Sequence, residues 1–296
     1  MRERTISIIG AGIVGTAIAS LLQARGYKIA ALAGRTQASL ARAGSYVDAK
    51  ATNDVVEAAR LGDIIFITTK DDSVKHVCET IAAHGGFSQD DIVFHTSGAL
   101  PLMVLGGAKH LGAQVGSIHP MQAFATIDSA IENLPGSVFG VTAEDEALIV
   151  ADDLVRALGG TVIKIADKDR ALYHAAACAV SNYLVSLVDF STALYATIGV
   201  PEDQARQAFL PLLRGTVDNI AKLGPAQALT GPIARCDVGT VVRHLKAIDE
   251  TAPWAGRLYR EMGAYTVKVG MEKGTVDKES AQALLAALDR SELMSD

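Results

Sequence analysis

The segment Thr5–Thr36, TISIIGAGIVGTAIASLLQARGYKIAALAGRT, constrains the fold more than any other part of this chain. The β-branched run Ile6–Ile9 ends at a G-x-G-x-x-G sequence, after which apolar residues recur at helical spacing until Gly26. Between a strand and a helix, the first glycine permits a tight turn, the second admits a pyrophosphate and the third lets the helix pack closely. Free N–H groups at the helix start favour an anion. We therefore predict a dinucleotide site formed by Gly10, Gly12, Ile13, Val14 and Gly15.

The end of the second predicted strand, Lys28–Leu32, indicates which dinucleotide binds. An NAD site usually carries Asp or Glu there for the ribose 2′-hydroxyl, whereas this strand leads into Ala-Gly-Arg-Thr. Arg35 is placed to pair with a 2′-phosphate, and Thr36 and Ser39 can add hydroxyl donors. The alternative is that Arg35 is a solvated loop charge. We favour NADP, with Gly34, Arg35 and Thr36 at the cofactor.

Composition excludes several classes of protein. A chain of 296 residues, 49% hydrophobic, is long enough for two domains with hydrophobic cores. Its net charge of −6 and few aromatic residues offer no basic surface for nucleic acid, which we exclude as a partner. No apolar leader follows a basic segment, so we expect a cytoplasmic protein. The scattered cysteines Cys78, Cys178 and Cys236 lack zinc-site spacing, and we expect reduced thiols and no metal.

The segment Ala171–Val188 contains eighteen residues without a formal charge and raises the question of a membrane span. It is rich in alanine and carries His174, Ser181 and Asn182, and no basic flank anchors one end only. We therefore predict a buried helix of a soluble domain and no membrane partner.

Strands alternate with helices as far as residue 165, which predicts a mostly parallel, doubly wound α/β sheet. The predicted strands are 6–9, 28–32, 46–52, 63–69, 92–94, 114–118, 137–142 and 161–165. One intervening helix is predicted over Asn53–Leu61 with Asn53 as its cap. Beyond Asp167 the pattern is helical only. The helices expected there are Lys168–Ile198, Pro201–Leu223, Val238–Thr251, Pro253–Lys273 and Lys278–Asp289. We expect an NADP-binding domain at 1–166 and an all-helical substrate and dimerisation domain at 167–296.

Polar residues follow three of these strands at the edge where ligands bind in such sheets. Thr68, Thr69 and Asp71 are candidates to touch the cofactor, although a plain strand-to-helix turn would need the same residue types. His95 and Ser97 follow the next strand, and His119 follows the one after it. A satisfied loop histidine is an equal alternative for His95. We favour a functional role for His119 because Pro120 fixes the local backbone, and we expect the nicotinamide over Thr69, Ser97 and His119.

The long helix from Asp167 carries a polar stripe on an otherwise apolar surface. Counting 100° per residue from His174 places these positions within a stripe roughly 100° wide: Cys178, Ser181, Asn182, Val185, Asp189 and Thr192. Buried polar groups need hydrogen-bond partners, which either a neighbouring helix or a substrate could provide. We favour the substrate for His174 and Asn182 and leave Asp189 and Thr192 open.

A second cluster of functional groups lies in Leu229–Asp237, where Gly-Pro interrupts the helical pattern. Thr230 offers a hydroxyl, Arg235 a fork of donors suited to a carboxylate, and Asp237 a carboxylate. We predict that this loop binds substrate. The alternative is a structural clamp between Arg235 and Asp237.

The motifs GAGIVG, GRT, HTSGAL, HPMQAF, YHAAACAVSNY and LTGPIARCD together resemble bacterial Rossmann-like proteins whose C-terminal region is a domain of unknown function. Some of these act as an alternative type of ketopantoate reductase, within the superfamily of 6-phosphogluconate and β-hydroxyacid dehydrogenases. The resemblance covers nearly the whole chain. It implies a Rossmann domain followed by an all-α domain of the 6-phosphogluconate dehydrogenase type, and NADPH-dependent reduction of a small 2-keto acid such as 2-dehydropantoate. The helical domain is itself rich in apolar faces, from which we expect a homodimer.

The sequence departs from the common ketopantoate reductases on the long helix. Those enzymes carry Lys, Asn and Asn at successive four-residue steps, where this chain has His174, Cys178 and Asn182. Without the lysine, His174 or His119 is expected to donate the proton, Asn182 to hold the oxygen, and Cys178, Thr230, Arg235 and Asp237 to contact the substrate. Cys236 stands where the resembling proteins usually have Gly.

Three alternatives remain from the sequence. His119-Pro120-Met121 also resembles prephenate and arogenate dehydrogenases, in which His119 would act as a base. Imine reduction of the pyrroline-carboxylate type is a second alternative within the enzymes. The third is a non-catalytic NADP-binding regulator.

Overall fold

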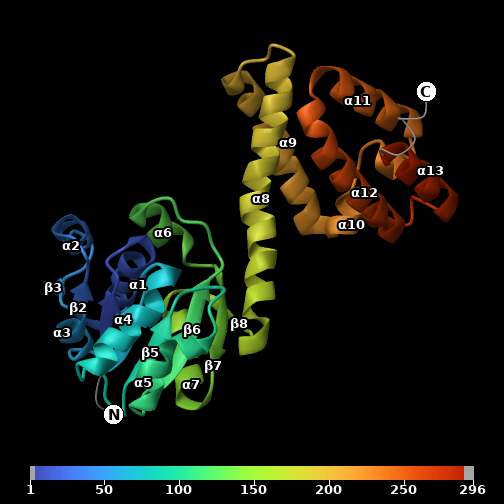
Figure 1. The fold of residues 1–296 in the computed structure, drawn as a ribbon. Coiled ribbons are helices and arrows are strands. Elements are labelled where there is room, and N and C mark those ends of the chain that lie inside the picture. Colours follow the sequence, from blue (N-terminus) through green and yellow to red (C-terminus); the bar gives the residue numbers. More distant parts are fainter. Residues whose placement is uncertain (1–3, 290–296) are drawn as a thin grey trace. The chain divides into compact units, whose positions relative to one another are not determined.

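The computed structural model describes residues 4–289 and divides into two compact units, Met1–Ser181 and Asn182–Asp296 (Figure 1). The division falls within one long helix, α8 (Arg170–Thr197), whose first turns have their contacts in the first unit. The sequence-based boundary at residue 166 lies just before this helix and stays a prediction.

The first unit contains an eight-stranded sheet with the order β3-β2-β1-β4-β5-β6-β7-β8 (Figure 1). All neighbouring strands run parallel except β6 and β7. The strands are β1 (Thr5–Ile9), β2 (Lys28–Ala33), β3 (Lys50–Thr52), β4 (Ile64–Ile67), β5 (Ile92–His95), β6 (Gln114–Pro120), β7 (Val138–Ala143) and β8 (Thr161–Lys164). The predicted mostly parallel α/β sheet is confirmed.

Helices cover both faces of this sheet. They are α1 (Ile13–Ala24), α2 (Gln37–Gly44), α3 (Val55–Ala59), α4 (Asp71–Ala83), α5 (Gly106–His110), α6 (Ile127–Asn133) and α7 (Asp145–Ala157). Successive residues of β4 point to opposite faces, so Phe66 packs in a core with α1, α6 and α7 while Ile65 and Ile67 pack in a core with α3, α4 and α5. A strand buried on both faces is continuously apolar, which explains its sequence.

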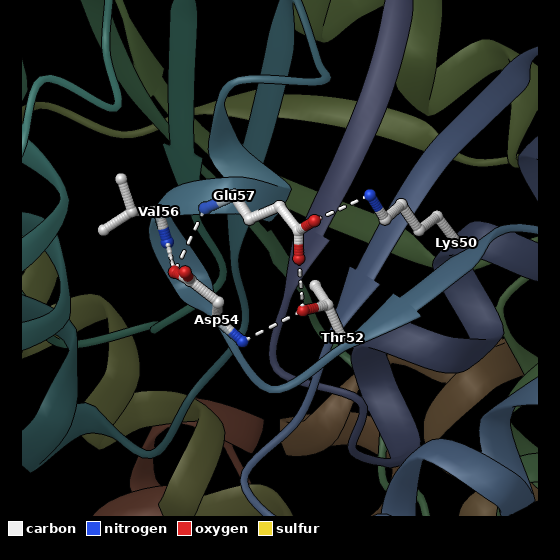
Figure 2. A network of polar contacts seen from close by, with 5 residues as sticks. All are labelled: Lys50, Thr52, Asp54, Val56 and Glu57. Carbon is white, nitrogen blue, oxygen red and sulfur yellow. Dashed lines mark hydrogen bonds and ion pairs between the residues drawn. The ribbon is translucent and has the colours of Figure 1, made fainter.

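The corner between β3 and α3 corrects one prediction. Asp54, and not Asn53, caps α3, and its carboxylate accepts hydrogen bonds from the N–H groups of Val56 at 2.8 Å and Glu57 at 3.1 Å. Glu57 in turn pairs with Lys50 at 2.6 Å, as Figure 2 shows. Asp and Asn are equivalent caps by residue type, so the sequence could not choose between these neighbours.

The second unit is helical throughout its described residues, as predicted. Besides the later turns of α8, its helices are α9 (Glu202–Leu223), α10 (Pro225–Ala228), α11 (Val238–Thr251), α12 (Gly256–Lys273) and α13 (Lys278–Leu288). Apolar side chains of α11, α12 and α13 form one core, which includes Val241, Val267 and Leu284. The short helix α10 was not predicted.

The predicted burial of α8 is wrong for the described chain. The segment Asp167–Thr197 is long and apolar enough to cross a membrane, and no residue of its most apolar window is buried. Leu172 is 77% exposed and Val180 75%. One such helix is weak evidence for a membrane protein. An apolar composition indicates that a helix tends to be buried, but it does not identify the surface that buries it. Within the described residues, no other segment buries the apolar window of α8. The cytoplasmic location stays a prediction.

Candidate active site

The glycine loop between β1 and α1 has the geometry of a close turn. Gly10 has a φ of +128°, and a Cβ there would lie 2.8 Å from the carbonyl carbon of Thr68. A Cβ on Gly15 would meet the Gly10 carbonyl and the Thr68 hydroxyl at less than 3.0 Å. Around Gly12 there is open space, so its backbone can be approached from outside. The backbone thus forms a cradle at the start of a 12-residue helix.

The two threonines after β4 differ in what their hydroxyls do. Thr68 Oγ1 donates to the Gly10 carbonyl at 2.7 Å and so holds the glycine loop from behind. Thr69 Oγ1 is buried and has no hydrogen-bond partner among the described residues. A buried hydroxyl without a partner is costly, so a ligand that supplied one would be favoured at this point. Ile13 and Val14 lie half-buried at the beginning of α1.

The segment after β2 presents Arg35 to solvent. Gly34 lies close to Leu40 and Ser39, where a Cβ would be 2.9 Å from one and 3.0 Å from the other. Thr36 caps α2 by accepting from the Ser39 N–H at 3.2 Å. Arg35 is exposed and takes part in no hydrogen bond or ion pair within residues 4–289. Its guanidinium is therefore available to a ligand at this edge.

The loop after β5 is tied down by its own polar side chains. His95 is fully buried, and its Nδ1 accepts from the Ser97 N–H at 3.2 Å. Ser97 Oγ donates to the Asp71 carboxylate at 2.7 Å and accepts from the N–H groups of Ala99 and Leu100. These bonds occupy the Ser97 hydroxyl, so Ser97 and Asp71 act here as a loop clamp. A contact between Ser97 and the cofactor stays a prediction.

His119, Tyr173 and His174 form an aromatic cluster beside this loop. His119 lies within β6, one residue beyond the predicted strand end at residue 118, and its Nδ1 is 2.8 Å from the Tyr173 hydroxyl. The rings of His119 and His174 meet edge to face with centroids 5.7 Å apart. Gly98 is the floor of the cluster, because a Cβ there would come within 3.0 Å of both imidazoles. Gly140, paired with His119 across β6 and β7, leaves room for the Tyr173 ring in the same way.

Burial and neighbouring positive charge determine the protonation of these histidines. Burial, with smaller effects from His174 and Arg170, lowers the pKa of His119 to about 4. Burial, with smaller effects from Arg170 and His119, lowers the pKa of His95 to about 3. Both imidazoles are therefore neutral at neutral pH. Burial also raises the pKa of Tyr173, so its phenol keeps its proton and can donate to His119 Nδ1. When the phenol is the donor, the neutral His119 ring carries its proton on Nε2, which faces Gly98.

The remaining predicted residues divide between the two units. Cys178 lies one turn after His174 in the first unit, with its sulfur 3.7 Å from His174 Nδ1. Asn182 and the loop residues Thr230 and Arg235 are exposed in the second unit. Their contribution to a site with His119 and His174 stays a prediction.

Asp237 has a local structural task. Its carboxylate caps α11, accepting from the Thr240 N–H at 2.9 Å and the Thr240 hydroxyl at 2.7 Å, and these bonds lower its pKa. The neighbouring Cys236 has a φ of +56°, a left-handed conformation that favours glycine. A glycine would adopt this conformation without a steric penalty from a Cβ.

Sequence reasoning missed Gly98, Tyr173 and Gly140. Gly98 and Tyr173 lie within the motifs HTSGAL and YHAAACAVSNY, in which only the histidines, the serine, the cysteine and the asparagine were predicted to be functional. An invariant spacing of His and Gly cannot be seen in one sequence, and the contact of Gly140 with Tyr173 depends on strand pairing. Among residues 4–289, no group of three or more potential ligands could hold a metal ion.

Comparison with known proteins agrees with this architecture. Residues 2–120 match the Rossmann-like domain, and residues 137–266 match a domain of unknown function, DUF2520. The chain thus carries a Rossmann-like domain followed by a DUF2520 domain, the combination that the motifs predicted. A search of curated proteins finds no match.

Solved structures share the fold. A Bacteroides fragilis protein assigned as an NADP oxidoreductase is 24% identical, covering 90% of this chain and 98% of its own, with a TM-score of 0.72. A Thermotoga maritima protein is 23% identical over 94% and 98% of the two chains, with a TM-score of 0.68. Plasmodium falciparum pyrroline carboxylate reductase, solved with NADP bound, is 14% identical over 98% and 100%, with a TM-score of 0.57. At these identities the likeness establishes the fold.

Proposed function

We propose that this protein is an NADPH-dependent oxidoreductase that reduces a small 2-keto acid such as 2-dehydropantoate. One observation carries the proposal: a nucleotide-type glycine loop and a cluster of His119, Tyr173 and His174 occur in the same unit. The parallel strands β1, β4, β5 and β6 end at one edge of the sheet, which is where ligands bind in this class of fold.

The residues present fit a bound dinucleotide. The open backbone at Gly12, the cradle closed by Gly10 and Gly15, and the unpartnered hydroxyl of Thr69 suit a pyrophosphate and its neighbouring groups. Bound NADPH would supply the hydride. The chain itself would position the carbonyl and manage the proton.

The neutral His119 is unsuited to act as a cationic acid at neutral pH, so we assign proton donation to His174. His119 would hold the carbonyl oxygen or orient His174 through its Nε2–H, with Tyr173 fixing the ring. Asn182 would assist in holding the oxygen, and Arg235 would bind the substrate carboxylate. Thr230, Cys178 and Asp237 would shape the substrate site.

Reduction of a C=N bond is the second candidate. Its support is the shared fold with the P. falciparum pyrroline carboxylate reductase and the absence of a lysine at the start of α8 in this chain. The same histidines would then serve a cyclic imine that carries a carboxylate. Prephenate-type oxidation, with His119 as base, is a further alternative. The low pKa of His119 is compatible with it, because a neutral imidazole can accept a proton.

A substrate panel tests the proposal. NADPH oxidation at 340 nm is measured with 2-keto acids including 2-dehydropantoate, with cyclic imino acids and with aldehydes, and NADP reduction is measured with prephenate. We expect the fastest turnover with a 2-keto acid. Faster imine turnover would replace the first candidate with the second. Tight NADPH binding without turnover of any compound would favour a non-catalytic regulator.

Arg35→Ala is expected to weaken NADPH binding about 10- to 100-fold and to leave NADH binding nearly unchanged, because a charge-assisted pair with the 2′-phosphate is lost. Fluorescence titration with both cofactors measures this. Arg42→Ala, at the far end of α2, is the matched control. Equal weakening of both cofactors, or tighter NADH than NADPH binding by the wild type, would contradict the NADP assignment.

We also propose a homodimer in which a second copy covers α8 and α9. The support is their exposed apolar surface, including Val185 at 70% and Leu212 at 67% exposure. Sedimentation velocity is expected to give twice the monomer mass, and Val185→Lys is expected to shift the species toward monomer. A monomer that remains at high micromolar concentration would contradict the proposal.

A further inference from the structure

Arg170, the first residue of α8, is a fully buried arginine. Arginine is almost never buried completely unless its guanidinium is paired. Within residues 4–289 no carboxylate lies within ion-pairing distance of it, and its hydrogen-bond acceptors are all neutral. The hydrogen-bond acceptors of the guanidinium are thus all neutral oxygens, while the carboxylates of Asp167 and Asp71 stabilise its charge from beyond ion-pairing distance. Such burial requires good hydrogen-bond geometry.

The guanidinium joins two segments of the sheet unit. Its Nε donates to the Leu100 carbonyl at 2.6 Å, and its Nη2 donates to the Ser97 carbonyl. Its Nη1 donates to the Thr142 hydroxyl on β7 at 2.7 Å. The two carbonyls bracket Gly98, the residue against which His119 and His174 rest. Arg170 therefore determines where this loop stands relative to β7 and to the histidines.

We propose that Arg170 is a positioning residue of the candidate active site, which fixes the loop Ser97–Leu100 under His119 and His174 and places a permanent positive charge near the imidazoles of His95 and His119. It touches neither substrate nor cofactor in this role. The inference rests on the proposed oxidoreductase function for its kinetic consequence, but the placement and the charge can be measured without any substrate.

The charge has a defined effect on the cluster. After burial itself, Arg170 is the next cause that lowers the pKa of His95, and it contributes to the low pKa of His119. Other groups of the cluster also face these rings or the guanidinium. They are Asp71 on α4, Asp167 before α8, and Tyr173, His174 and Cys178 on α8. With no ion-paired carboxylate to cancel it, the guanidinium favours the neutral forms of His95 and His119.

Two variants separate placement from charge. Arg170→Lys keeps a cation but loses the fork of donors, and we expect kcat to fall about 100-fold, as for a misplaced catalytic group, while KM and NADPH affinity change less than about threefold. Arg170→Gln keeps N–H donors but removes the charge. In that variant we expect the pKa of His119, followed by NMR of the imidazole, to rise by about one unit.

Matched controls are Arg156→Lys and Arg156→Gln on the exposed surface of α7, which should change neither quantity. If the Arg170 variants do not fold, Thr142→Val removes one acceptor and is expected to lower kcat about tenfold. Wild-type kcat in Arg170→Lys or in Thr142→Val, or an unchanged His119 pKa in Arg170→Gln, would overturn the proposal. If no compound is turned over, the NMR titration still decides it, so failure of the proposed function is recognised separately.

Discussion

Gly98→Ala is expected to lower kcat/KM for the proposed reduction at least 100-fold, because displacement of a catalytic group by about 1 Å can cost about that much. The added Cβ would lie closer than 3.0 Å to both His119 and His174. The loop cannot retreat, since Ser97 and Leu100 on either side are held by Arg170. The imidazoles must therefore move apart, and the His119 contact with Tyr173 is disturbed.

Steady-state kinetics with the best substrate of the panel measures this effect, and NADPH titration shows whether cofactor binding survives. We expect NADPH affinity to stay within about threefold, since the glycine loop is untouched, and stability to fall by about 1–3 kcal/mol from overpacking. Gly44→Ala, at the open end of α2 where a Cβ meets nothing within 4 Å, is the matched control. Full activity in Gly98→Ala would show that this cluster is not the reacting site.

Acid is expected to destabilise the protein between about pH 6.5 and 5, before most carboxylates titrate. An unfolded histidine has a pKa near 6.5, whereas in the folded protein the pKa is about 3 for His95 and about 4 for His119. Above pH 6.5 both states are neutral and the full stability is present. As the pH falls, only the unfolded state takes up protons, so the free energy of unfolding decreases until the folded pKa is reached.

Between pH 7.5 and pH 5, each of the two histidines is expected to lower the free energy of unfolding by about 2 kcal/mol. Urea denaturation at constant ionic strength measures the loss. In His119→Asn the difference between the two pH values is expected to shrink by about 2 kcal/mol, whereas His76→Asn on the exposed face of α4 should leave it unchanged. Carboxyls with a lowered pKa, such as Glu57 and Asp277, act at lower pH. An undiminished pH difference in His119→Asn would mean that this ring is protonated in the folded protein.

The periodicity of apolar residues and the positions of turn and cap residues were sufficient to predict most of the fold. The strand at Ile64–Ile67 and the helix α8 were predicted to within a few residues, because burial on two faces and a helical repeat are local signals. The short helices α5, α6 and α10 were missed, because helices of four to seven residues are too short to show a helical periodicity of apolar residues. The exposure of α8 was also missed, because apolar content does not identify the partner that covers it.

The candidate site was predicted unevenly. His119 and His174 were singled out and do meet, although they lie more than fifty residues apart. Ser97 and Asp237 were assigned to ligands, yet their oxygens hold a loop and cap a helix. Ser and Asp are chosen for both tasks for the same reason, a short side chain with a hydrogen-bonding oxygen. Only the position of the partner, such as Asp71 for Ser97, distinguishes the two.

By itself, the sequence determined the dinucleotide-type turn at Gly10–Gly15, the alternation that builds the sheet and the all-helical end of the chain, because each is written in residues that are neighbours along the chain. Only the tertiary structure decided that Gly98 lies beneath two histidines, that His119 is neutral, and that Arg170 is buried with neutral hydrogen-bond acceptors. Each of these depends on close approach and desolvation between distant segments, which no local pattern records.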